Sequence, residues 1–162
     1  LEFRRVLFRS RRDWSITAVD ISRAALSVAR DNAVRLGLRN VSFLQGDWCR
    51  PLEGPPFDAI ASNPPYIDPD DAALQDLRHE PRSALAAPDA GHADLLTIAD
   101  GARAWLKPGG LLLLEHGATQ APRLAAELVA RGYAQVVCHP DLAGLPRVTV
   151  AQWPGRHSPT NL

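Results

Sequence analysis

The sequence predicts an α/β fold built on a mostly parallel sheet flanked by helices. Short runs of β-type residues alternate with helical patterns from Trp14 to Trp153, and such alternation with short connections is typical of parallel sheets. Acidic or amide residues lie at or just after the ends of several predicted strands, which places polar side chains along one edge of the sheet. The last two strands are joined by a loop without a helix, so we expect them to pair antiparallel.

The first half of the chain contains three predicted strands and one helix. We expect strands at Ser15–Asp20, Val41–Leu44 and Phe57–Ser62. Between the first two strands, Ser22 is a good N-cap, and apolar residues recur at helical spacing until Gly37 ends the helix.

The second half begins with a long polar, proline-containing loop from Ile67 to about Gly91. Loops of this length in compact domains tend to be functional or disordered. After the loop we expect a helix at 94–106, a turn at 107–110, a strand at 111–115, a helix at 121–131 and strands at 134–139 and 147–153.

The composition disfavours a nucleic-acid or membrane partner. Lysine plus arginine and aspartate plus glutamate both total 18, so no basic surface that attracts phosphates is expected. The longest apolar run, 111–114, is far too short to span a bilayer. Cys49 and Cys138 lie far apart and belong to no Cys/His cluster, which predicts reduced thiols and no metal site. We expect a cytoplasmic monomer.

The sequence Asn63-Pro64-Pro65-Tyr66 follows a predicted strand and carries the strongest chemical signal. Two prolines stiffen the backbone and remove two donors, so an amide oxygen and a free carbonyl form a fixed pair of acceptors. Such a pair can hold both hydrogens of an –NH₂ group, and the tyrosine ring offers a flat face beside it. The alternative is that the tetrapeptide is only a turn, since asparagine and proline are common turn residues.

Further polar and aromatic residues lie near the ends of predicted strands, where ligands of such sheets bind. Asp20 ends a strand and is a candidate acceptor for ribose hydroxyls, or else an acid that stabilises the following helix through its dipole. Asp47 and Trp48 follow the next strand and could bracket an adenine ring, although a lone tryptophan is more commonly a core residue. Glu115-His116 could indicate general-base chemistry or a structural turn, and His116 is left unassigned.

These segments together resemble the PrmC/HemK family of class I methyltransferases, the release-factor glutamine methyltransferases. The resemblance covers about Trp14 to Trp153, and its motifs are at 18–22, 45–48, 63–67, 80–91, 94–96, 113–117 and 147–150. It implies a Rossmann-like sheet with an antiparallel last strand, S-adenosyl-L-methionine as cofactor and no metal. The implied reaction is methyl transfer to the side-chain amide of the glutamine in the Gly-Gly-Gln loop of peptide chain release factors.

The same resemblance implies roles for individual residues. Asp20 would bind the ribose, and Asp47 and Trp48 the adenine. Asn63 to Tyr66 would hold the glutamine amide as the catalytic residues. Asn63 would also bind the methionine end of the cofactor.

One departure from the family lies at the beginning of the sequence. The family has an acidic, glycine-rich strand-loop before this region, but the first glycine here is Gly37. We expect residues 1–10 to be an artefactual non-family segment, 11–154 a partial catalytic domain without the central first strand and its glycine loop, and 155–162 a disordered tail.

Two other functions remain open from the sequence. The tetrapeptide is shared by methyltransferases that act on the amino groups of adenine or cytosine in nucleic acid. A chain without the glycine loop could also be an inactive fragment that serves only as an interaction surface.

Overall fold

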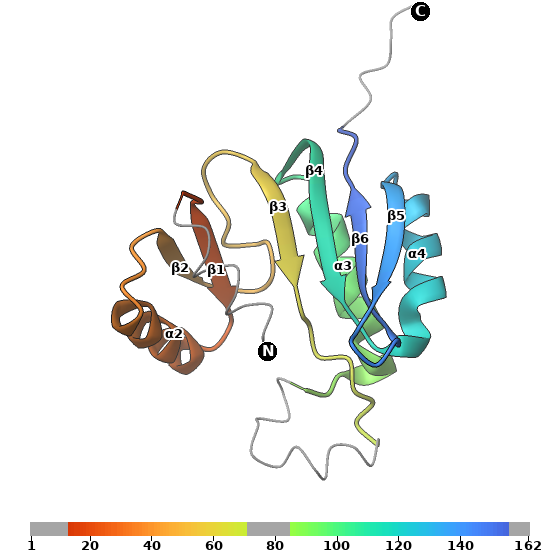
Figure 1. Ribbon diagram of the computed structural model, residues 1–162, viewed down its shortest axis with the longest axis horizontal. Helices are drawn as coiled ribbons and strands as arrows, with labels where there is room; N and C mark the ends of the chain where they lie inside the picture. Colours follow the sequence, from red (N-terminus) through yellow and green to blue (C-terminus); the bar gives the residue numbers. More distant parts are fainter. Residues whose placement is uncertain (1–12, 71–84, 156–162) are drawn as a thin grey trace, which may run out of the picture. The chain divides into compact units, whose positions relative to one another are not determined.

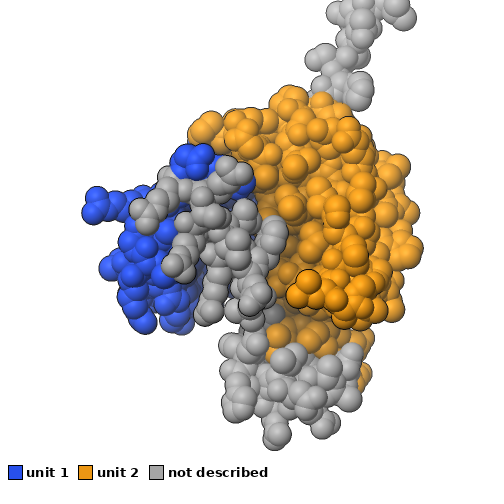
Figure 2. Space-filling model, in the orientation of Figure 1, with its two compact units in different colours: residues 1–54 blue, residues 55–162 orange. Residues whose placement is uncertain are grey.

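The computed structural model describes residues 13–70 and 85–155 and divides into two compact units, residues 1–54 and 55–162 (Figure 2). The described strands form two sheets, one in each unit. The expected non-family segment 1–10 lies outside the described residues. Of the tail expected to be disordered, Gly155 is described and buried, and 156–162 lie outside the described residues.

The first unit contains a parallel pair of strands and one helix. Strand β1 (Ile16–Asp20) pairs with β2 (Val41–Gln45) over its whole length. Helix α2 (Arg23–Arg35) connects them and contacts both strands. Ser22 caps it as expected, since its hydroxyl accepts a hydrogen bond from the third residue of the helix. Gly37, in the left-handed region at φ +64°, follows the C-terminus.

The second unit contains a four-stranded sheet in the order β3-β4-β6-β5. Its main elements are β3 (Phe57–Ser62), α3 (His92–Ala102), β4 (Leu106–Glu115), α4 (Ala121–Ala130), β5 (Ala134–Pro140) and β6 (Pro146–Gln152), with short 3₁₀ helices η3 (Pro88–Gly91) and η4 (Ala118–Gln120). β3 and β4 are parallel, and β6 runs antiparallel to both β4 and β5. The predictions of a mostly parallel sheet and an antiparallel last pair are confirmed.

The core of the second unit lies between the sheet and helices α3 and α4, which cover the same face (Figure 1). Alternate residues of β4, including Leu112 and Leu114, point to this side and are fully buried. They meet buried leucines such as Leu95 from α3 and Leu124 from α4. Because β3 and β4 pair in parallel up to Ser62 and Leu114, their carboxyl ends lie side by side.

The predicted boundary between the helix at 94–106 and the turn at 107–110 is wrong. Helix α3 ends at Ala102, and β4 already begins at Leu106, which pairs with Phe57. The segment 107–110 forms an irregularity inside β4 that is nevertheless bonded to its neighbour. Gly109 donates to the carbonyl of Trp153, and Trp153 donates to the carbonyl of Gly110. Pairing with adjacent strands therefore overrode the local turn preference.

None of the helices within the described ranges is long and apolar enough to cross a membrane.

Candidate active site

The tetrapeptide Asn63–Tyr66 starts immediately after β3, at the carboxyl end of that strand. The Asn63 side chain is exposed, whereas Pro64 is fully buried. Within 13–70 and 85–155, neither the Asn63 amide oxygen nor the Pro64 carbonyl oxygen accepts a hydrogen bond. Both groups predicted to hold an –NH₂ group therefore lack a partner among the described residues, with Asn63 at the surface and the Pro64 carbonyl in a buried residue, on a backbone stiffened by proline.

Residues 85–91, at the end of the long loop, contact the tetrapeptide and the residue that follows it. Ile67 donates to the carbonyl of Leu85 at 3.0 Å, and Ala87 donates to the carbonyl of Ile67 at 3.1 Å. Gly91, at φ +72°, lies so close that an added Cβ would overlap the Pro65 carbonyl oxygen and come within 3.0 Å of its carbon. Only glycine permits this approach. The residues from 85 to 91, which were predicted to be part of the long loop, therefore act as a clamp for the tetrapeptide.

Tyr66 is anchored by two charged residues. Its hydroxyl donates to Oε1 of Glu115 at 3.2 Å, and the guanidinium of Arg147 lies over its ring, 5.7 Å from the centroid. Burial raises the pKa of the Tyr66 phenol, and the negative charge of Glu115 raises it further, while Arg147 opposes this shift. The phenol therefore stays protonated at neutral pH and acts as a hydrogen-bond donor.

His116, which follows Glu115, has a structural environment. Its side chain is fully buried, with Nε2 2.8 Å from the Thr149 hydroxyl and Nδ1 2.9 Å from the Gly117 carbonyl. Burial lowers the pKa of His116, so the ring is neutral at physiological pH. Both ring nitrogens have partners inside the protein. His116 therefore fits the structural alternative for Glu115-His116 and not the general-base one.

Asp20 ends β1 and helps begin α2. One of its carboxylate oxygens accepts a hydrogen bond of 2.8 Å from the backbone of Ser22, and its carbonyl accepts one from Gly46 at 3.1 Å. The first contact fits the alternative in which Asp20 stabilises the helix start. It occupies one of two oxygens, so a carboxylate oxygen remains for a ligand.

Asp47 and Trp48 form the turn after β2, at the end of the strand pair where Asp20 lies. Trp48 is half-buried and has a positive φ of +48°, an uncommon conformation for an aromatic residue. Asp47 makes an exposed ion pair with Arg50 at 3.6 Å. Three of the four residues predicted to bind the cofactor therefore lie within residues 1–54, whereas the fourth, Asn63, lies within 55–162 with the other residues predicted to hold the amide.

No group of histidine, cysteine, aspartate or glutamate side chains in the described part of the chain could hold a metal ion.

Comparison with known families gives a match over most of the sequence. A model described as a methyltransferase domain matches residues 3–144. Among solved structures, a methyltransferase from Pyrococcus furiosus superposes with a TM-score of 0.69 at 18% identity, over 96% of this chain and 70% of that one. TrmN from Thermus thermophilus gives a TM-score of 0.55 at 26% identity, over 84% and 35%. The fold is that of the class I methyltransferases.

The sequence is also similar to curated release factor glutamine methyltransferases. The protein from Shewanella oneidensis is 46% identical over 151 residues, which cover 92% of this chain and 53% of the relative. The proteins from Yersinia pestis and Escherichia coli are 46% and 42% identical, each over 91% of this chain and 54% of the relative. The chain thus spans about half the length of the curated relatives it matches.

Proposed function

The chain belongs to the methyltransferase domain family, and we propose that it transfers a methyl group from S-adenosylmethionine to the side-chain amide nitrogen of the glutamine in the Gly-Gly-Gln loop of peptide chain release factors. The observation that carries this proposal is the exposed Asn63 beside the unpaired Pro64 carbonyl at the end of β3. The likeness to release factor glutamine methyltransferases supports the choice of substrate.

The chemistry depends on orientation. An amide nitrogen is a poor nucleophile because its lone pair is delocalised into the carbonyl. Asn63 and the Pro64 carbonyl would each accept one N–H hydrogen, which aims the nitrogen and favours its pyramidal geometry. Correct alignment can be equivalent to an effective molarity of about 10⁵ M or more. The nitrogen would gain the methyl carbon as the bond from that carbon to sulfur breaks, leaving a neutral thioether, and the methylated nitrogen would release one proton to water, so this scheme requires no metal and no protein base.

The residues of the first unit offer contacts for the methyl donor. When bound, S-adenosylmethionine supplies an electrophilic methyl group on a sulfonium. The free carboxylate oxygen of Asp20 would accept from ribose hydroxyls, and the turn at Asp47 and Trp48 would receive the adenine. Asn63 would lie beside the methionine end. The acidic and aromatic contacts are thus available in the first unit, where the first glycine of this sequence is Gly37.

Transfer of labelled methyl groups to a release factor and to an oligonucleotide, followed by mass spectrometry, tests the substrate. We expect label on the release factor glutamine and none on the oligonucleotide. Asn63→Ala should abolish most of the transfer. Asn32→Ala, which truncates an exposed asparagine on α2, is the matched control.

Two results would contradict the proposal. Label on the oligonucleotide alone would assign the chain to amino-group methylation of nucleic acid. Transfer that is undiminished by Asn63→Ala would remove the tetrapeptide from the mechanism. Calorimetry with S-adenosylmethionine tests the cofactor separately. It is run on this chain and on a variant with a glycine-rich strand-loop added upstream, and absence of binding in both would contradict S-adenosylmethionine as the cofactor.

A further inference from the structure

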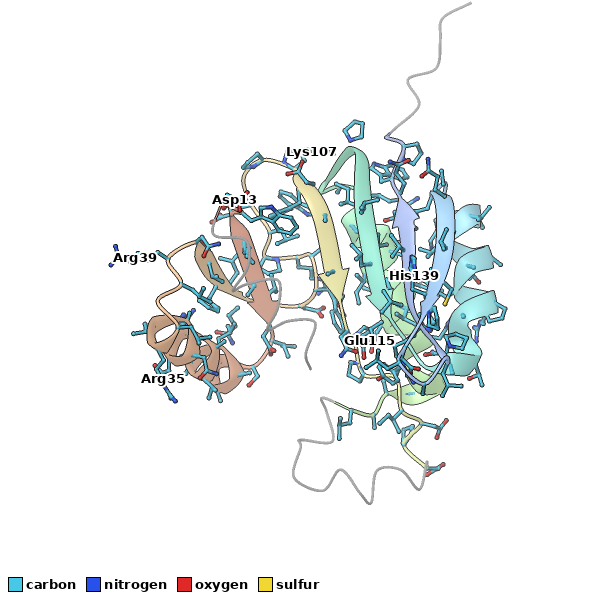
Figure 3. The ribbon with its side chains drawn as sticks, in the orientation of Figure 1. Asp13, Arg35, Arg39, Lys107, Glu115 and His139 are labelled. Atoms are coloured by element: carbon cyan, nitrogen blue, oxygen red, sulfur yellow. The ribbon has the colours of Figure 1, made fainter. Side chains whose placement is uncertain are left out.

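Three segments of the second unit converge on the ring of Tyr66. The residue itself follows β3, Glu115 is the last residue of β4, and Arg147 lies near the start of β6. Figure 3 shows Glu115 at one end of β4 and Lys107 at the opposite end. The Tyr66 hydroxyl donates to Glu115, and Arg147 lies over the ring.

Arg147 is itself held on several sides. Its Nε and Nη2 donate to Oδ2 of Asp141 at 3.2 and 3.1 Å, and its Nη1 donates to the His116 carbonyl at 3.2 Å. The other oxygen of Asp141 accepts hydrogen bonds from the backbone of Ala143 and Leu145 at 2.9 and 3.0 Å. The turn between β5 and β6 therefore fixes the carboxylate, and the carboxylate fixes the guanidinium.

These contacts determine what Tyr66 can offer to a ligand. Its hydroxyl is already committed to Glu115, and one face of its ring meets Arg147. Its remaining surface is apolar and flat, which suits packing against a planar amide. A free phenol would instead compete for the N–H groups that Asn63 and the Pro64 carbonyl must receive.

We propose that Glu115, Arg147 and Asp141 are positioning residues that hold the Tyr66 ring in one orientation, so that the ring packs on the substrate amide while its hydroxyl is kept away from it. This inference rests on the proposed function and extends it to residues outside the tetrapeptide. None of the three needs to touch the substrate. Glu115, which the sequence placed at a strand end without a definite role, acts through Tyr66.

A spectroscopic titration tests the contacts without any reference to activity. The sequence contains two tyrosines, and the other, Tyr133, is buried with its hydroxyl on the Ala99 carbonyl. Ultraviolet titration of the wild type and of Tyr66→Phe identifies the Tyr66 transition by difference. Glu115→Gln should move that transition to lower pH, because a negative charge that disfavours the phenolate is removed.

The same titration includes a variant expected to shift the Tyr66 transition in the opposite direction, and two matched control variants. Arg147→Met should move the Tyr66 transition to higher pH, because Arg147 favours the phenolate. Lys107→Met and Asp58→Asn break an ion pair of 2.7 Å at the far end of β4 and should leave the transition in place. A transition that is unmoved by both Glu115→Gln and Arg147→Met would overturn the proposal.

Kinetics then decide whether the contacts serve methyl transfer. Tyr66→Phe and Glu115→Gln should each lower kcat about tenfold, with KM little changed, because a misplaced ring loses alignment more than binding. The double variant should be no worse than either single variant, since both remove the same hydrogen bond. Arg147→Lys should restore part of the activity that Arg147→Met loses.

Each outcome separates this inference from the function on which it rests. Multiplying losses in the double variant, or a Glu115→Gln defect without a Tyr66→Phe defect, would show that Glu115 does not act through Tyr66. No transfer by the wild type would contradict the proposed function, and the titration would still decide whether Glu115 and Arg147 hold the ring.

Discussion

Gly91→Ala is the sharpest test of how the tetrapeptide is held. The new Cβ would overlap the Pro65 carbonyl oxygen, whereas real Cβ atoms essentially never come closer than 3.0 Å to such a neighbour. Backbone on both sides of the contact leaves no flexible side chain to give way. The Pro65 carbonyl and Gly91 must therefore separate by about 1 Å or more to reach ordinary van der Waals distance.

Two costs follow from this change. Alanine at φ +72° is strained by about 1–2 kcal/mol, which should lower the midpoint of denaturant unfolding. The displacement of the tetrapeptide should lower kcat for methyl transfer by about 100-fold, the loss that a misplacement of about 1 Å can cause. Denaturation followed by circular dichroism measures the first cost, and single-turnover transfer measures the second.

Gly37→Ala separates strain from displacement. Gly37 has a similar φ of +64° but no heavy atom within 4 Å of an added Cβ, so its alanine variant suffers strain without a clash. We expect it to lose stability and to retain transfer. If Gly91→Ala also loses only stability and keeps wild-type transfer, the clamp does not set the geometry of the tetrapeptide and the reasoning is refuted.

Three other changes have defined outcomes. Ser22→Ala removes the cap of α2 and should cost about 1 kcal/mol of unfolding free energy in chemical denaturation; an unchanged midpoint would mean that the cap contributes nothing. Tyr133→Phe removes a buried donor 2.7 Å from a carbonyl of α3 and should also cost about 1 kcal/mol, which thermal unfolding would detect. His116 has a pKa lowered below the ordinary 6.5 by burial, so the unfolded state binds its proton more readily. Its contribution to stability is complete above pH 6.5 and is lost as the pH falls towards the folded pKa, and His116→Gln should flatten the fall in unfolding free energy measured over that range.

Much of the fold could be predicted because strands and helices leave local patterns. The strand at Phe57–Ser62 and the helix between Ser22 and Gly37 were predicted almost to the residue, since an apolar run and a capped amphipathic segment depend on neighbours in sequence. The segment 107–110 was not, because its hydrogen bonds go to Trp153. Proline and glycine there carry a turn signal that only the adjacent strand overrides.

The candidate site divides in the same way. The tetrapeptide could be recognised from its amino-acid sequence, since the rigidity of proline and the hydrogen-bonding capacity of asparagine are properties of the residues themselves. The residues that hold the tetrapeptide could not be predicted, because Gly91 and Arg147 contact it only through tertiary packing. For Gly91, the sequence offered one signal, namely a glycine within the long loop after Tyr66. Nothing local indicates that Arg147 stacks on that ring.

The hydrogen bonds and ring contact described for Tyr66 and Ile67, and the close approach to Pro65, come from the second unit: the clamp at 85–91, the end of β4 and the start of β6. The glycine loop that the family places upstream would serve the cofactor, and the candidate cofactor residues Asp20, Asp47 and Trp48 belong to the other unit. Adding that loop should therefore tighten S-adenosylmethionine binding in calorimetry and leave the Tyr66 titration where it is. A shift of the Tyr66 transition on adding the loop would mean that amide holding and cofactor binding are coupled, and that the tetrapeptide geometry is not set by residues 55–162 alone.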